Sequence, residues 1–474
     1  MGGFFYVGEK KERPDNYHRI TNTGSVAASG AQEGIGAAVV TGNWGAIGKA
    51  VTVTSSDDFK KYVGEGSGYN TLKQLFDGGV NTAVVVRVGT GGTVGTVTLK
   101  DTTASTAKGA VKITGKYPGT FALAVSVKAS LSDDSIKEVN ILHGTTVLEN
   151  YKIAAGTGEV KALVAALADS SYVKAEEQSG SNGTLAEIAQ ASMDGGADPS
   201  VTTASYGDGF TALEPEVWNS ICVDSNDAAV HALLQAYIDR IYESGSYPLA
   251  TVSEPHSVAL ETRMTHAQAF DDEKMHYVLN GWVDSDGTEI EGYLAAARVA
   301  GMIGAIASND SLTHKSISRA VSLIEPLTNS QIIKALKMGC VVISTSKATQ
   351  QVRIEKGINT KTTLAANMDA GWKKIRRTKT RFELMSRIDA TIDQLNGNVN
   401  NDEDGRSAIM AAGQSVLDAM IGEKKLLTGA EFIEDPSNPA YGDSAWFLIN
   451  ADDIDSFEIG YLTYGFRFSQ PTEE

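Results

Sequence analysis

The segment Gly42-Asn-Trp-Gly-Ala-Ile-Gly-Lys-Ala resembles a phosphate-binding loop, because glycines and a lysine follow an expected strand. Such a loop needs a glycine five residues before Gly48, and that position is Asn43. It also needs a Ser or Thr hydroxyl for Mg²⁺ after the lysine, and Lys49 is followed by Ala50. We therefore interpret this segment as an ordinary glycine loop.

A second segment imitates half of a calcium-binding loop. Asn400, Asp402, Asp404 and Gly405 have the spacing of its first ligands and its central glycine. The twelfth position, where a bidentate glutamate closes the coordination shell, is Ala411. We interpret these residues as a solvated turn before the next helix.

The histidines show no metal or catalytic pattern. His256, His266 and His276 recur every ten residues, but the chain has no His-Glu-x-x-His motif and no cysteine near any of them. It also has no Gly-x-Ser-x-Gly turn of the kind that exposes a catalytic serine. We predict that the chain is not an enzyme, with no catalytic residue, no metal site and no cofactor.

One charge feature stands out. Residues 373–387 carry seven positive charges, opposed only by Glu383. A run of this kind is usually a solvated helix face. A nucleic-acid site would need more aromatic residues than Trp372 and Phe382, and an acidic protein partner fits the run equally well.

Composition limits the class of protein. The 474 residues carry 41 Lys and Arg against 58 Asp and Glu, a net charge of −17, with 42% hydrophobic and 21% charged residues. This describes a soluble protein of several domains, and its acidity argues against wholesale binding to nucleic acid or anionic membrane. Cys222 and Cys340 lie in apolar runs and are expected to be buried thiols of a protein made in a reducing compartment. We see no targeting signal at the N-terminus.

The pattern of strands and helices predicts an α/β core domain, residues 31–90 with 201–345. Continuous apolar runs such as Ala83–Val88 are typical of a covered parallel sheet. Asn226 is expected to cap a helix with apolar residues at 3–4 spacing. Residues 91–200, rich in Thr and Gly with alternating Val, predict a β-rich insertion domain.

The remaining chain predicts an α+β C-terminal domain over residues 346–455, with helices 380–396 and 405–421. An N-terminal arm (1–30) and a C-terminal arm strand (456–474) flank the domains. Both ends are apolar and β-prone, which is a liability unless each strand pairs with a sheet. They either join a neighbouring subunit or complete their own domain, and the pattern alone leaves both interpretations open.

Several stretches, in order, resemble the contractile tail sheath family of phages and phage-tail-like bacteriocins, in particular its Gram-positive branch. The resemblance covers residues 1–90 and 195–474, and the insertion matches weakly. Pro14-Asp15 and Lys361 depart from the family pattern. The matching stretches are Glu12–Arg19, Val51–Phe59, Tyr62–Gly64, Leu75–Val80, Val84–Val88, Gly195–Asp198, Tyr206–Val223, Val352–Thr363, Lys379–Arg381 and Asp404–Arg406.

The resemblance implies a structural protein that polymerises as stacked rings around a tail tube and contracts to drive the tube through a target cell envelope. Its insertion domain would face outward. It also implies two sets of site residues. Strand exchange between subunits would use Phe4, Phe5, Tyr6, Val7, Phe457, Ile459, Tyr461, Tyr464 and Phe466, and the tube would face Lys373, Lys374, Arg376, Arg377, Lys379 and Arg381.

The implied partners are further copies of the chain, the tail tube protein, and baseplate and tail terminator proteins, with no nucleic acid and no small-molecule substrate. Assembly would occur in the host cytoplasm, and the product would be a virion tail or an extracellular bacteriocin particle. Two other classes stay open: a nucleotide-dependent α/β enzyme, and a surface-layer or adhesin-like protein suggested by the Thr/Gly-rich insertion.

Overall fold

A seven-stranded sheet forms the centre of the molecule, in the order β17-β13-β12-β11-β1-β3-β2. All neighbouring pairs are parallel except β2 and β3. The computed structural model describes residues 34–467, so the predicted strand Phe4–Val7 lies outside the described residues. The strands are β1 (Ile35–Val40), β2 (Ala50–Val53), β3 (Thr82–Arg87), β11 (Ser220–Val223), β12 (Leu249–Ser253), β13 (Met275–Val278) and β17 (Cys340–Val341).

Helices cover both faces of this sheet, because alternate strand residues on each face are apolar. Ala37 and Val39 pack toward one set of helices, whereas Ala38 and Val40 pack toward the other. The first face is covered by α4 (Thr203–Ala212), α5 (Ala228–Glu243), α6 (Leu260–Phe270) and α8 (Asn329–Lys337). The second face is covered by α1 (Phe59–Val63), which follows the 3₁₀ turn η1 (Ser56–Asp58), α2 (Ser67–Asp77) and α7 (Tyr293–Ala305).

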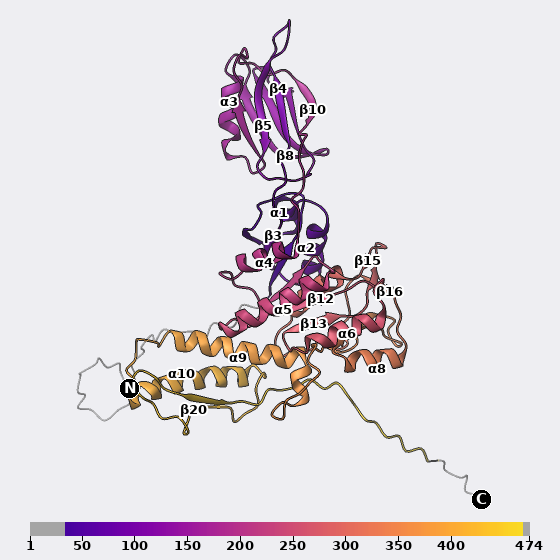
Figure 1. Cartoon of the computed structure of the whole chain (residues 1–474), viewed down its shortest axis with the longest axis vertical. Coiled ribbons are helices and arrows are strands. Elements are labelled where there is room, and N and C mark those ends of the chain that lie inside the picture. The colour runs from indigo at the N-terminus through magenta and orange to yellow at the C-terminus, as the bar shows by residue number, and fades with distance from the viewer. Residues whose placement is uncertain (1–33, 468–474) are drawn as a thin grey trace, which may run out of the picture.

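A β-rich unit is inserted between β3 and α4. One sheet has the order β10-β6-β7-β8 and the other the order β4-β5-β9, with a shared apolar core. Figure 1 shows this unit at one end of the molecule, beyond the central sheet. Its elements are β4 (Thr96–Lys100), β5 (Gly109–Gly115), β6 (Leu123–Ala129), β7 (Ile136–His143), β8 (Thr146–Ala154), α3 (Glu159–Ala166), η2 (Leu167–Asp169), β9 (Val173–Glu177) and β10 (Ile188–Ser192).

The last part of the chain packs two long helices against a hairpin. Helix α9 (Ile375–Asp393), preceded by η3 (Ala370–Lys373), and helix α10 (Glu403–Gly422) share a core with β20 (Glu431–Glu434) and β21 (Phe447–Asn450). Two small sheets precede this unit along the chain: β14 (Trp282–Asp284) with β15 (Glu289–Ile290) and β16 (Ala320–Leu323), and β18 (Ile343–Thr345) with β19 (Val352–Ile354). The predicted mixed α/β and α+β fold class is confirmed.

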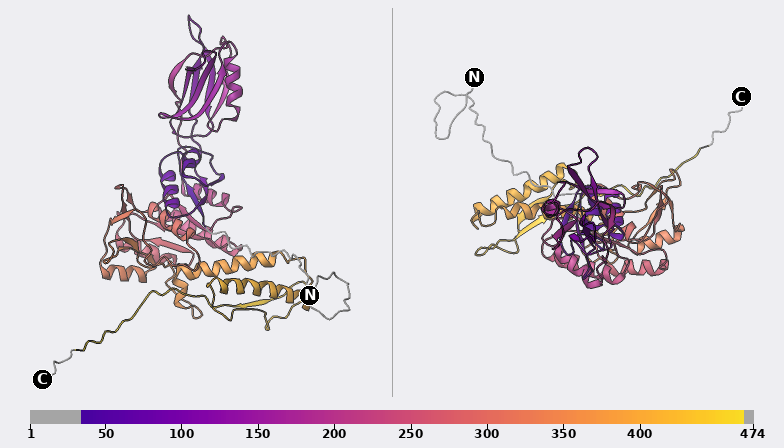
Figure 2. Two further views of the ribbon diagram at one scale, coloured as in Figure 1. Left: turned by 180° about the vertical axis from the view of Figure 1, so that it is seen from behind. Right: turned by 90° about the horizontal axis from the view of Figure 1, so that it is seen from above.

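Both views in Figure 2 show the C-terminal segment running away from the body as an extended trace. Among the described residues, no helix combines the length and apolar character that a membrane span requires.

Two local expectations were wrong. Helix α5 is capped by Asp227, whose Oδ1 accepts from the Ala229 N–H at 2.9 Å, while Asn226 instead accepts from the Tyr293 N–H at the start of α7, at 2.8 Å. Helix α9 begins at Ile375 rather than at residue 380, so most of the basic run is helical. In the single chain, residues 456–467 form no strand, because a strand needs a partner and the segment lies away from every sheet, so the C-terminal arm strand stays a prediction.

Candidate functional site

The glycine loop after β1 joins the central sheet to the β-rich unit. Trp44 on this loop packs among Tyr117, Phe121 and Tyr172, with ring centroids 5.4–6.0 Å apart. The buried Arg87 guanidinium donates to the carbonyls of Gly42 (2.9 Å) and Gly45 (2.7 Å) and to Pro118 across the junction (3.0 Å).

Glycine is required in this loop by a close approach of the backbone. At Gly45 the φ angle is +102°, and a Cβ there would lie 1.8 Å from the Tyr62 carbonyl oxygen. The loop that resembled a phosphate site is therefore a structural connector.

The carboxyl ends of β1 and β11 meet where the strand order reverses, which is where doubly wound sheets bind ligands. Here the Asp224 carboxylate fills that place. It accepts hydrogen bonds from the Thr41 N–H (2.8 Å) and hydroxyl (2.6 Å), from the Ser67 hydroxyl (2.7 Å) and from the Tyr206 hydroxyl (2.7 Å). Burial and the Asp224 charge raise the pKa of Tyr206. Both carboxylate oxygens of Asp224 are therefore engaged within the chain at this point of the sheet.

The three evenly spaced histidines each have a separate structural partner. His256 Nδ1 lies 2.6 Å from Glu291, and His266 Nδ1 lies 2.7 Å from Glu254. His276 is buried against the Ala250 carbonyl oxygen, and burial lowers its pKa to about 4. Within residues 34–467, no three metal-binding side chains come together.

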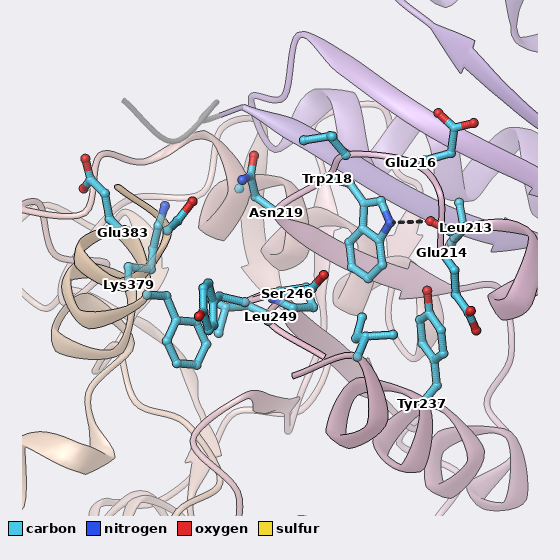
Figure 3. A pocket seen from close by; sticks show the side chains of 18 of the residues that line it. Leu213, Glu214, Glu216, Trp218, Asn219, Tyr237, Ser246, Leu249, Lys379 and Glu383 are labelled. Atoms are coloured by element: carbon cyan, nitrogen blue, oxygen red, sulfur yellow. Dashed lines mark hydrogen bonds between the residues drawn. The ribbon is translucent and has the colours of Figure 1, made fainter. Parts of the chain in front are cut away.

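A cavity of about 260 Å³ lies between the central domain and α9 (Figure 3). Among its lining residues, Trp218 donates from Nε1 to the Leu213 carbonyl at 3.2 Å, and Lys379 donates to the Ile303 carbonyl at 2.6 Å and to that of Ile306. These two lining residues are therefore bonded to backbone carbonyls of the chain itself.

Of two further lining residues, the Glu383 side chain is hydrogen-bonded within the described part of the chain and the Tyr237 side chain is not. Glu383 accepts from Lys425 at 2.7 Å and from Arg387 and Ser308. The hydroxyl of Tyr237 has no hydrogen-bond partner among the described residues.

The cations of the basic run make contacts within the chain instead of an exposed positive patch. Lys374, Arg376 and Arg377 contact the segment 453–458. Lys379 caps the C-terminal end of α7, where a positive charge is favourable. The expectation of a solvated face is therefore wrong for Arg376 and Lys379, which are buried.

The other two predicted tube-facing residues also have partners in the chain. Lys373 donates to the Thr362 carbonyl at 2.9 Å, and the Arg381 guanidinium lies 3.6 Å from the ring centroid of Trp372. Contact of the run with a tube stays a prediction.

The C-terminal segment exposes its large apolar side chains. From Phe457 to Phe466, the predicted strand-exchange residues are mostly exposed to solvent. The exposed fractions are 89% for Phe457, 62% for Ile459, 92% for Tyr461, 73% for Tyr464 and 84% for Phe466. Leu462, which we did not predict, is 77% exposed.

The hairpin β20–β21 is a two-stranded sheet with unequal edges. Its register, with Asp435 N–H bonded to the Trp446 carbonyl, places the N–H groups of Phe432 and Glu434 on the outer edge of β20 and those of Phe447 and Ile449 on the outer edge of β21.

Gln414 of α10 occupies part of the β20 edge. It accepts from the Phe432 N–H at 3.1 Å and donates to the Ala430 carbonyl at 3.0 Å. Within the described part of the chain, nothing bonds the outward groups of Phe447 and Ile449.

Comparisons with known proteins agree with this architecture. Residues 200–360 match the family model of the phage tail sheath protein central domain. The chain is 25% identical over 394 residues to the phage-like element PBSX protein XkdK of Bacillus subtilis, covering 79% of this chain and 78% of that protein.

The match over residues 200–360 is to the contractile tail sheath family, and the chain as a whole is similar to proteins of that family. The sheath tail protein of Desulfitobacterium hafniense has the same fold, with a TM-score of 0.69 at 22% identity, covering 89% of this chain and 97% of that one. The contracted helical sheath of the anti-feeding prophage is similar over 96% of this chain and 99% of that one, with a TM-score of 0.55 at 8% identity. These similarities assign the sheath fold.

The acidic partners of the basic run and the role of Gln414 were not predicted from the sequence. Asp453, Asp455 and Glu458 lie directly before and within the apolar C-terminal segment, a charge pattern complementary to residues 373–387. That complementarity was a visible signal for the contact. The Gln414 contact depends on how α10 packs against β20 and has no signal in the sequence.

Proposed function

We propose that this chain polymerises into the contractile sheath around a tail tube, and that its contraction drives the tube through a target cell envelope. The observation that carries this proposal is the exposed apolar C-terminal segment, in a chain that also has a hairpin with an open β21 edge. Fully burying one large apolar side chain is worth about 1.5–3 kcal/mol. A segment with six of them exposed is costly for a monomer and favourable in a polymer.

The receiving edge in this proposal is β21. Main-chain groups that point outward at an edge can pair with an added strand, and alternate side chains then set its register. Apolar side chains around this edge are partly exposed: Trp446 by 44%, Leu448 by 42% and Ile449 by 37%. The β20 edge is less accessible because Gln414 already bonds its backbone.

The N-terminal strand Phe4–Val7 is assigned to the same exchange, on the strength of the resemblance alone. The proposed division of the chain keeps residues 31–90 with 201–345 as the core domain, 91–200 as an outward-facing insertion, and 346–455 as the domain nearest the tube. The tube, baseplate and terminator proteins are the proposed partners, with assembly in the host cytoplasm.

Contraction needs no nucleotide in this proposal. Rigid domains rotate while main-chain bonds between strands persist, and the extended lattice moves to a better-packed one. The filled switch point at Asp224 supports an energy source in the subunit interfaces. The particle is either an infectious phage or a bacteriocin.

The donor side is tested by the triple variant F457S/I459S/Y461S. All three side chains are exposed in the single chain, so its thermal unfolding should match that of the unchanged protein. We expect the variant to remain monomeric by sedimentation velocity at concentrations where the unchanged protein forms polymers. Leu131→Ser is the matched control, because Leu131 is a fully exposed apolar residue on the β-rich unit. Polymers from the triple variant would exclude the C-terminal segment as donor.

The receiving edge is tested by proline, which removes one outward N–H. Ile449→Pro should block polymerisation, whereas Glu434→Pro makes the same change on the β20 edge and should allow it. The opposite result would place the incoming strand on β20.

A further inference from the structure

Among the described residues, the last backbone-to-backbone contact between the C-terminal segment and its own domain is short. The Leu427 N–H bonds to the Asp452 carbonyl at 2.8 Å, and the Ile454 N–H bonds to the Lys425 carbonyl at 3.0 Å. This single bridge holds three residues by the main chain. The residues that follow are held by charge.

Arg377 makes the first charged contact. Its Nε lies 2.6 Å from Oδ2 of Asp453, and its Nη2 contacts Oδ1, so the pair is bidentate. The remaining nitrogen Nη1 donates to Asp369 at 3.0 Å, which orients the guanidinium. Asp369 itself caps η3 through the Gly371 N–H at 2.9 Å. Bidentate Arg–carboxylate pairs combine strength with fixed geometry.

Lys374 and Arg376 extend this contact to the residues that follow Asp453. Lys374 Nζ lies between Asp455 (2.6 Å) and Glu458 (3.1 Å). Arg376 is buried and donates to the Ile454 carbonyl.

Glu458 marks the end of the held segment. Its Oε1 accepts from the Thr313 hydroxyl at 2.9 Å, and its side chain is only 7% exposed. The next residue, Ile459, is 62% exposed, so the held segment ends at Glu458.

We propose that Lys374, Arg376 and Arg377 form an anchor for the C-terminal arm. The anchor fixes the point and direction at which residues 459–467 leave the domain. This inference rests on the proposed function for what the arm does, but the anchor is a property of one chain. A force that a neighbouring subunit exerts on the arm is transmitted through the anchor to the start of α9. The hydrogen bonds of Lys379 to the C-terminal end of α7 then transmit it to the central domain.

The anchor and a tube-facing role for the same cations predict different effects of a charge reversal. An anchor requires the acidic residues of the same chain, so reversing Arg377 frees residues 453–458 even when no tube is present. A tube contact requires only the tube, so the same reversal weakens tube binding and leaves residues 453–458 protected.

The test is hydrogen exchange on the full chain at a concentration where it is monomeric. We expect Arg377→Glu and Asp453→Arg each to raise the exchange rate of the Ile454 N–H about tenfold or more, and the double variant R377E/D453R to restore slow exchange. Arg240→Glu is the matched control, since it breaks an exposed ion pair with Glu214 and should leave residue 454 unchanged. Arg377→Lys keeps the charge and loses the bidentate geometry, so its Ile454 N–H should exchange at a rate between those of the unchanged protein and Arg377→Glu. This variant also covers the case in which a charge reversal fails to fold.

Unchanged exchange in both single reversals would overturn the anchor. So would faster exchange in the singles without recovery in the double variant, because the effect would then not depend on the pair. If exchange behaves as expected but the unchanged protein forms no polymer, the anchor stands and the proposed function fails.

Discussion

The guanidinium of Arg377 holds both carboxylate oxygens of Asp453, a residue 76 positions further along the chain. The hydrogen bond to Asp453 raises the pKa of Arg377. The hydrogen bond from Arg377 to Asp369 lowers the pKa of Asp369. One side chain therefore connects the loop before α9, the helix itself and the root of the C-terminal arm. The ion pairs of Arg377 therefore hold the start of the C-terminal arm against the two-helix unit.

Acid should weaken this C-terminal unit. A hydrogen bond from Arg387 holds the pKa of Glu423 at about 2. Burial opposes ionisation of Asp455, but hydrogen bonds that include one from Lys374 outweigh it and keep its pKa below the ordinary value. A carboxyl whose folded-state pKa is lowered stabilises the fold above its unfolded pKa, about 4, and loses that contribution as pH falls through the folded value.

The melting temperature of the unassembled chain should therefore fall between roughly pH 4.5 and pH 2. Glu423→Gln should flatten that dependence, because the variant has one acidic group fewer to titrate. A slope that is identical in both proteins would show that Glu423 is not linked to stability.

Gly413→Ala should destabilise the hairpin. A Cβ at this position of α10 would lie 2.4 Å from Cδ2 of Phe432, so the ring must move and the core must repack. We expect a loss of about 1–3 kcal/mol in the free energy of unfolding, measured with urea. Gly422→Ala is the matched control on the same helix, because nothing lies within 4 Å of its Cβ, and it should be neutral or slightly stabilising. Equal effects of the two variants would contradict the close contact with Phe432.

Trp44→Ala should loosen the β-rich unit from the central domain. Trp44 is 2% exposed and belongs to the core of the inserted unit, although it lies on a loop of the central sheet. Truncating a buried tryptophan costs about 3–5 kcal/mol. Calorimetry should then show the inserted unit melting earlier. Trp446→Ala, at a partly exposed tryptophan, should have little effect on the unassembled chain. A single unchanged transition in the Trp44 variant would contradict the role of this residue at the junction.

Asp224→Asn should reduce stability by about 1–3 kcal/mol, because the amide cannot accept all the hydrogen bonds that the carboxylate accepts. Asp208→Asn, at an exposed position, carries the same charge change and should be neutral.

Nucleotides should not change the melting temperature of the unchanged protein, since a ligand that binds the folded state raises that temperature. A nucleotide-dependent rise would support the α/β enzyme class instead.

Much of the fold follows from the pattern of apolar residues. The runs around Ala83–Val88 and Ile221–Val223 are apolar on both faces, as strands covered by helices must be, and both form central strands of the sheet. The alternation in Leu123–Ala129 likewise predicts the β-rich unit. Each of these patterns lies within a few consecutive residues, so it can be read from a single sequence.

The site was less predictable, because its contacts join distant parts of the chain. Nothing near Arg376 indicates that it will be buried against Ile454, and the basic run alone favours a solvated face. The exposed alternation from Phe457 to Phe466 was visible, since apolar residues at a chain end have few partners within their own domain. Whether such a strand is given to another copy depends on assembly, which the pattern of one chain does not encode.

The most direct test of a sheath joined by its ends is electron microscopy of the purified chain over rising concentration, beside a variant lacking residues 1–22 and 459–474. That variant keeps Asp453, Asp455 and Glu458, so its C-terminal domain retains the anchor. We expect hollow striated tubes from the full chain and only monomers from the shortened one. Tubes from both proteins, or monomers from both in the presence of the tube protein, would contradict assembly by exchange of the terminal strands.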